Sequence, residues 1–98
     1  MLNTNYIPYI GDTVIDLGTN ITSYTAPTDG WINVRGLSSR TGEHAFVDLE
    51  LDSGYYSRSH IINGDNLGLP NGLPLKKGQT VKILTQNSTI VSAKFYTK

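Results

Sequence analysis

The chain has 98 residues, no cysteine, and equal numbers of basic and acidic residues, 8 of each. A single domain is expected at this length, and the absence of cysteine excludes disulfides, thiol catalysis and Cys-based zinc sites. The zero net charge argues against nucleic-acid binding, because contacts to phosphate need a basic surface.

Residues with a branched β-carbon dominate the composition. Thr, Ile and Val far outnumber Ala and Glu, and no long apolar stripe of helical period occurs. Branched side chains fit the pleated surface of a strand better than the surface of a helix. We therefore expect an all-β fold with almost no helix.

Segments of alternating polar and apolar residues recur along the chain and predict about seven or eight short antiparallel strands. Turn residues separate these segments, which is typical of a β-sandwich or jelly roll. In chain order, the segments are residues 6–10, 13–17, 21–25, 31–36, 44–52, 55–62, 79–85 and 89–97.

The segment 44–52 alternates most regularly. Its apolar phase would face the core and consists of Ala45, Val47, Leu49 and Leu51. The opposite phase carries three carboxylates, those of Asp48, Glu50 and Asp52. We expect them to form a solvated strand face that discourages unwanted edge pairing. The alternative is a contact with an arginine of another subunit, namely Arg35, Arg40 or Arg58.

Residues 48–59 resemble an EF-hand calcium loop only superficially. Gly54 stands one place too late, and Ser59 rather than glutamate occupies the twelfth position. We expect no metal and no cofactor. The two histidines, His44 and His60, lie on polar strand phases, and no G-x-S-x-G elbow is present. A surface or interface role for them is expected, and the protein is predicted not to be an enzyme.

Several large side chains are candidates for an interface or for ligand contact. Phe46 lies on the outer phase of its strand, and the adjacent Tyr55 and Tyr56 must point to opposite faces. Trp31 either joins such a surface or plugs the end of the sandwich. The full set of interface or ligand candidates is Trp31, Phe46, Tyr55, Tyr56, Arg58 and His60.

The segment 63–78 interrupts the alternation. It is rich in glycine, proline and asparagine, and we expect it not to form a regular strand throughout. A loop of this length is uncommon in a compact domain and is often functional. In a jelly roll it would be a long crossover between the two sheets.

The N-terminal residues have neither a basic region nor an apolar core of the kind found in signal peptides. No apolar run approaches the ~20 residues that span a bilayer. We therefore expect a protein made in the cytoplasm of its host cell, without a signal peptide and without membrane insertion.

Three segments carry a resemblance to a known family: 24–31 (YTAPTDGW), 75–81 (LKKGQTV) and 93–96 (AKFY). They resemble small jelly-roll domains of tailed-bacteriophage virion proteins, which are similar to the trimeric heads of the tumour-necrosis-factor and C1q type. The resemblance covers about residues 20–98. It implies a non-enzymatic homotrimer on the virion surface that contacts the major capsid protein or another virion protein.

These observations lead to one domain over residues 1–98, with 1–9 as an extended N-terminal arm. The absence of shaft-like repeats favours a capsid-decorating (head accessory) protein, whose arm would contact the shell by adding to a neighbour's sheet edge. The arm residues expected in that contact are Tyr6, Ile7 and Tyr9.

The alternative function is an adhesin: a fibre-tip, receptor-binding or carbohydrate-binding module that recognises a glycan on the host surface. The segment 63–78 and the aromatic residues Trp31, Tyr55 and Tyr56 would carry this activity.

Overall fold

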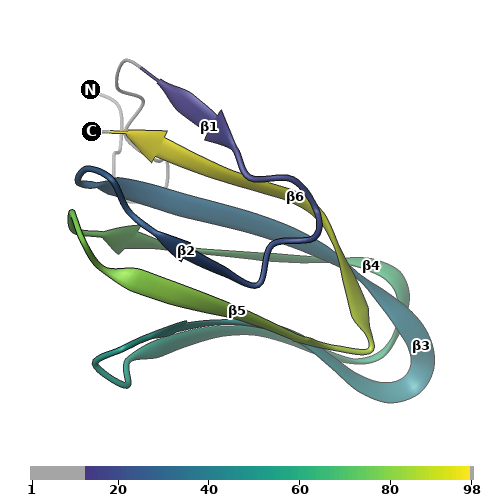
Figure 1. Ribbon diagram of the computed structural model, residues 1–98. Helices are drawn as coiled ribbons and strands as arrows, with labels where there is room; N and C mark the ends of the chain where they lie inside the picture. The colour runs from purple at the N-terminus through teal and green to yellow at the C-terminus, as the bar shows by residue number, and fades with distance from the viewer. Residues whose placement is uncertain (1–12, 98) are drawn as a thin grey trace, which may run out of the picture.

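The computed structural model describes residues 13–97, without the side chains of residues 40–42 and 63. No helix in this part of the chain is long and apolar enough to cross a membrane. The expected arm, with Tyr6, Ile7 and Tyr9, lies outside the described residues, as does the strand expected at 6–10. The strands are β1 (Val14–Asp16), β2 (Ser23–Thr25), β3 (Gly30–Leu51), β4 (Tyr56–Leu75), β5 (Thr80–Gln86) and β6 (Ser88–Thr97) (Figure 1).

Two strands are long enough to belong to both sheets. β3 and β4 form one antiparallel hairpin, with register shifts between Leu37 and Ser39 and between Arg40 and His44. Both ribbons bend at the end of the molecule that is remote from the chain termini (Figure 1). The first part of β3 pairs with β6, and its last part pairs with β5. The bend therefore carries both strands from one sheet into the other.

The strand order follows from these pairings. One sheet, the β6 sheet, contains β1, β6, the first half of β3 and the second half of β4. The other, the β5 sheet, contains β2, β5, the second half of β3 and the first half of β4. With each bent strand counted as two, 8 antiparallel strands form two sheets, which is the jelly-roll arrangement. This confirms the predicted all-β sandwich.

The core lies between the two sheets. Ala45, Val47 and Leu49 are fully buried, as the alternation predicts, and Leu51 is half-buried. The remaining buried apolar side chains come from β3, β4, β5, β6 and the turn after β2. They are Ala26, Ile32, Val34, Leu69, Leu73, Leu75, Val81, Ile83, Ile90, Ala93 and Phe95.

The long loop expected at 63–78 is wrong for most of its length, because β4 continues to Leu75. The segment is nevertheless not a regular strand throughout, as expected, since its pairing with β3 shifts in register and Asn66 has a φ of 58°. Between Leu69 and Leu75 the leucines and Asn71 face the core, while glycine and prolines occupy the outer phase. The pattern does not hold before Leu69, since Gly64 is buried and Leu67 is 46% exposed. Among the described strands, β4 pairs with β3 alone and therefore lies at an edge of both sheets, where proline is tolerated because no N–H is needed on the free side. The chain does cross between the sheets here, but it crosses as a bent strand.

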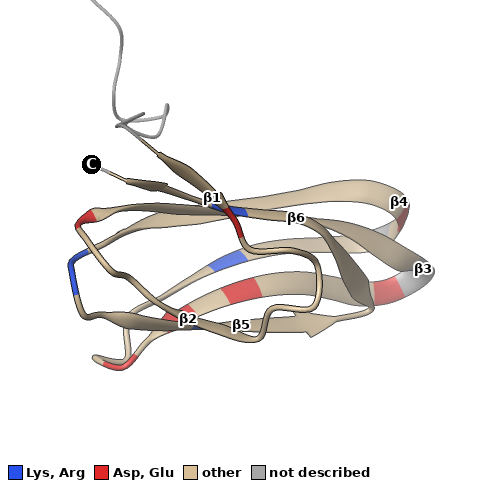
Figure 2. Cartoon of the chain, turned by 45° about the horizontal axis from the view of Figure 1, so that its top comes forward, with Lys and Arg blue, Asp and Glu red and all other residues tan. Residues whose placement is uncertain are grey.

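The two turn motifs noted in the sequence meet at one end of the sandwich. The backbone N–H of Gly78 donates to the carbonyl of Ala26 at 2.8 Å, and the N–H of Ala26 donates to Gln79 at 2.9 Å. The Asp29 carboxylate accepts from the N–H of Lys77 at 2.9 Å. These bonds fix the starts of β3 and β5 relative to each other. Acidic and basic residues are otherwise spread over strands and turns (Figure 2).

Candidate functional site

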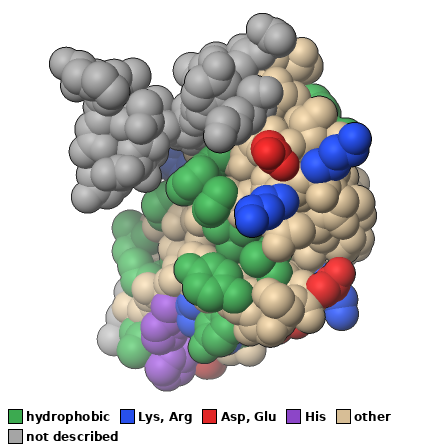
Figure 3. Space-filling view, turned by 90° about the vertical axis from the view of Figure 1, so that its left-hand side faces the viewer, with side chains coloured by type: hydrophobic (Ala, Val, Ile, Leu, Met, Phe, Trp, Pro, Cys, Tyr) green, Lys and Arg blue, Asp and Glu red, His purple; other side chains and the backbone are tan. Residues whose placement is uncertain are grey.

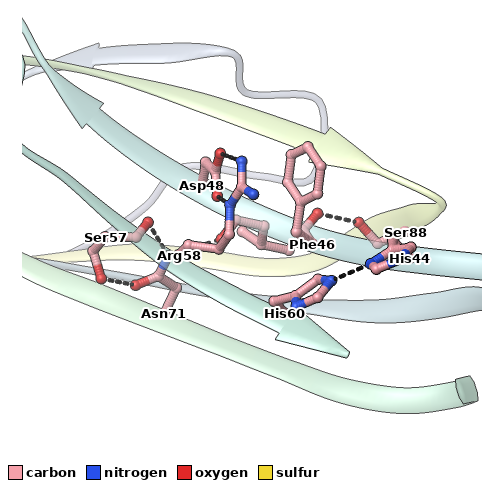
Figure 4. A network of polar contacts seen from close by, with 9 residues as sticks. His44, Phe46, Asp48, Ser57, Arg58, His60, Asn71 and Ser88 are labelled. Atoms are coloured by element: carbon pink, nitrogen blue, oxygen red, sulfur yellow. Dashed lines mark hydrogen bonds and ion pairs between the residues drawn. The ribbon is translucent and has the colours of Figure 1, made fainter. Parts of the chain in front are cut away.

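A cluster of aromatic, basic and histidine side chains lies on the outer face of the β5 sheet (Figure 4). It forms because directly opposite residues of an antiparallel pair point to the same face. The register places Phe46 opposite His60, and Asp48 opposite Arg58. Residues from two strands are thereby brought into contact within one sheet.

Asp48 and Arg58 form a bidentate ion pair at the centre of the cluster. Nε of Arg58 donates to one Asp48 oxygen and Nη2 to the other, both at 2.7 Å. The hydrogen bond that Arg58 donates to Asp48 raises the pKa of Arg58 above its usual value. Only 9% of the Asp48 side chain is exposed, so the expected solvated row of carboxylates is wrong at this position. The arginine that covers it comes from the same chain, directly across the hairpin.

The guanidinium of Arg58 also stacks on an aromatic ring. Its Cζ atom lies 4.1 Å from the ring centre of Phe46 and 5.9 Å from that of Tyr56. The cation–π contact with Phe46 and the two hydrogen bonds to Asp48 hold the Arg58 side chain in one orientation. The side chain is nevertheless 44% exposed, so a contact surface is available with little loss of rotamer freedom.

His44 and His60 extend the cluster towards the bend. Their rings are stacked at an angle of 10°, and Nδ1 of His44 lies 2.8 Å from Nε2 of His60. The side-chain amide of Asn87 donates to the carbonyl of His44 at 2.9 Å and anchors its backbone. Among the described residues, no three His, Cys, Asp or Glu side chains are grouped to hold a metal ion.

Exposed apolar side chains adjoin these groups. Tyr56, Ile62 and Leu84 are 54%, 50% and 44% exposed. Figure 3 shows the histidines beside hydrophobic side chains at the surface. Aromatic residues and arginine are enriched in protein interfaces, whereas unpaired charges are depleted from their centres. We call this surface the β5-sheet patch; it consists of Phe46, Asp48, Tyr56, Arg58, His60, Ile62 and Leu84.

Family models, curated proteins and solved structures give no match to this chain. The function is therefore argued from the geometry of the described residues and from their chemistry.

The six sequence-predicted candidates do not form one site. Phe46, Tyr56, Arg58 and His60 share the β5-sheet patch, while Tyr55 lies in the turn between β3 and β4 and is 63% exposed. Trp31 lies on the outer face of the β6 sheet, and its register partners are Pro74 and Tyr96. It is half-buried there and does not plug the space between the sheets.

Ile62 and Leu84 are patch residues that the sequence-based set omits. Each directly follows another apolar residue, Ile61 or Ile83, within a segment predicted to be a strand. The signal was available, because strict alternation makes the second residue of such a pair point outward.

Asn71 supports the patch from below. Its Nδ2 donates to the carbonyls of Val47 and Ser57 at 2.9 and 2.8 Å. Its Oδ1 accepts from the Ser57 hydroxyl and from the Gly72 N–H. The residue belongs to the β6-sheet half of β4, whereas Val47 and Ser57 belong to the β5 sheet. Asn71 therefore links the two sheets beneath the Asp48–Arg58 pair.

Proposed function

We propose that this protein is a non-enzymatic structural protein of a bacteriophage virion, which acts as a homotrimer and decorates the capsid surface. Its partners are further copies of itself and the major capsid protein or another virion protein. The jelly-roll topology and the β5-sheet patch support this proposal, together with the resemblance of the turn motifs to trimeric phage domains.

The single observation that carries the proposal is the composition of the patch. Its arginine is oriented by Asp48 and Phe46, and exposed Ile62 and Leu84 extend the apolar area around it. Because the central ion pair is internally neutralised, apposed copies bring no net charge from it into their contact. A chain this small also buries a limited core, and oligomer contacts would add to its stability.

Light scattering after size-exclusion chromatography tests the assembly. We expect a mass of three times 10.7 kDa for the natural chain. Leu84→Asp places a charge in the patch and should shift the mass towards the monomer. Val91→Asp is the matched control, because Val91 on β6 is 43% exposed and lies outside the patch. A monomeric natural chain at micromolar concentration, or equal effects of the two variants, would contradict assembly through this surface.

Binding to undecorated phage heads tests the second part of the proposal. We expect the protein to co-sediment with heads that lack it, at micromolar concentration and with saturation. Failure to bind, by a chain that is trimeric in the same buffer, would contradict capsid decoration while leaving self-association intact.

An adhesin that recognises a host glycan is the second candidate function. The platform expected from Trp31, Tyr55 and Tyr56 does not exist as one surface, because Trp31 lies on the opposite sheet from Tyr56. A groove whose lining includes Tyr96, the register partner of Trp31, favours this candidate instead. Loss of host-cell binding in Trp31→Ala, with an unchanged melting temperature, would support it, and retention of binding would argue against Trp31.

A further inference from the structure

A groove of about 220 Å³ lies on the outer face of the β6 sheet, opposite to the β5-sheet patch. The backbone of Val34 forms part of its floor. The side chains that line it are Asn33, Arg35, Pro70, Ser92, Lys94 and Tyr96.

The sequence explains why the sheet is hollowed here. Asn33 lies between Lys94 of β6 and Gly72 of β4, and Arg35 lies between Ser92 and Pro70. Ser92 and Pro70 have short side chains, so the longer side chains beside them form walls around a lower strip. The space above Gly72 is filled instead, since a Cβ atom there would lie 2.8 Å from Nε1 of Trp31. Pro70, one of the residues that obscured β4 in the sequence, thus helps to leave the strip open.

Two cations border the groove without an acidic residue in its lining. Arg35 and Lys94 are both exposed, and neither forms a salt bridge with any described residue. Asp16 is the register neighbour of Lys94 on β1, but its carboxylate accepts a hydrogen bond from the N–H of Gly18. The lining of the groove therefore carries two positive charges and no negative one.

We propose that this groove binds a sugar that carries a carboxylate, with a single hexuronic acid as its simplest ligand. The planar fork of Arg35 matches a carboxylate, and Lys94 adds a second positive charge. Asn33 and Ser92 provide donors and acceptors for ring hydroxyls. The half-buried ring of Tyr96 offers an apolar surface for the sugar's C–H groups.

The size of the groove sets the size of the ligand. Pockets for drug-sized molecules measure about 300–1,000 Å³, so this groove accommodates one sugar ring rather than an extended chain. The inference rests on the adhesin candidate and names its ligand class. It concerns a different sheet from the self-association proposal, so each can fail without the other.

Titration of the ¹⁵N-labelled full chain with sodium glucuronate, followed by amide chemical shifts, tests the proposal. We expect saturable shifts centred on residues 33–35 and 92–96, with a dissociation constant of about 1–10 mM. Glucose has the sugar ring without the carboxylate, and acetate has the carboxylate without the ring. Each should bind at least about tenfold more weakly than glucuronate. Arg35→Gln should weaken glucuronate binding about tenfold or more. Lys82→Gln, which removes an exposed lysine from the β5 sheet, should not change it.

Three outcomes would overturn the proposal: shifts centred elsewhere, equal binding of acetate, or an unchanged affinity in a folded Arg35→Gln variant. The mass of the assembly is measured on the same samples. A loss of trimer therefore cannot be mistaken for a loss of the sugar site.

Discussion

A single buried amide joins the two sheets of this protein. Asn71 is 8% exposed and makes four hydrogen bonds. No buried side-chain nitrogen or oxygen in the described part of the chain lacks a partner. Such fully satisfied polar networks specify one arrangement of a core, but they become costly when one member is removed.

Asn71→Ala should lower the free energy of unfolding by about 2–4 kcal/mol, because it leaves buried carbonyls of Val47 and Ser57 without their donor. Urea unfolding monitored by Trp31 fluorescence measures the loss. Asn20→Ala, at an exposed position, is the control and should change stability by less than about 0.5 kcal/mol. Equal effects of the two substitutions would show that the amide network contributes nothing.

Tyr24 should make the protein sensitive to alkaline pH. Its ring packs 5.3 Å from that of Phe95, and burial raises the pKa of Tyr24 above its usual value. The unfolded chain therefore loses this proton at a lower pH than the folded chain. Stability from this group is complete below pH about 10 and is lost as the pH rises towards the folded pKa.

Urea midpoints measured between about pH 8 and 11 test this expectation. Tyr24→Phe should reduce the fall of the midpoint above pH about 10. Tyr55→Phe is the control, since Tyr55 is 63% exposed and should leave the dependence unchanged. Identical pH profiles for Tyr24→Phe and the natural chain would refute the argument.

At the scale of elements, β3 and β6 approach closely where β3 begins. A Cβ atom at Gly30 would collide with the main-chain oxygen of Tyr96 and would lie 2.5 Å from Cζ of Phe95. Phe95 is fully buried, so it has little room to move. The pairing of β3 with β6 therefore depends on having glycine, which has no side chain, at position 30.

Gly30→Ala should cost about 1–3 kcal/mol of unfolding free energy, or prevent folding, because it overpacks the core. Gly68→Ala on β4 is the matched control. Its new methyl group would meet only the guanidinium of Arg35, at 3.6 Å, and should be tolerated. Thermal melting of both variants gives the comparison, and a stable Gly30→Ala protein would contradict the packing described here.

The alternation of polar and apolar residues predicted those strands in which outward-facing residues are polar and inward-facing residues are apolar. It succeeded for residues 44–51, for β5 and for residues 93–97 of β6, where inner residues such as Val47 and Phe95 are fully buried. It was wrong at the start of β6, because a register shift between Ile90 and Ser92 turns Ile90 inward and leaves Val91, which alternation places inside, 43% exposed. It failed for residues 63–75, because glycine and proline are strand breakers in a central position and are harmless at an edge. Edge position is set by pairing, which composition does not reveal.

The candidate site was predictable in part for the same reason. Strand phase identified Phe46 and His60 as outward-facing, because the side-chain period of a strand is two residues. It did not predict that Arg58 covers Asp48, since that contact depends on the register of the hairpin. The groove was not predicted either, because it requires three strands to lie side by side.

For the whole molecule, the paired charges of the β5-sheet patch predict how assembly responds to salt. Screening weakens attraction between opposed surface charges, but it has little effect on apolar contacts. We expect the trimer mass to stay constant when NaCl is raised from about 0.05 to 0.5 M. Dissociation over this range, seen by light scattering, would indicate an interface held by charges, and therefore a surface other than the patch.

The bent hairpin of β3 and β4 has a consequence for the order of folding. Its turn is closed by backbone hydrogen bonds between Leu51 and residues 54–55. Strand pairing that starts at this turn forms two strands of each sheet. The pair β1–β6 joins Val14 to Tyr96, almost the full length of the chain, and must overcome a large loop-closure entropy. We therefore expect high φ-values at Val47 and Leu49 and low ones at Ile15, so that the long hairpin forms the folding nucleus and the N-terminal strand docks last.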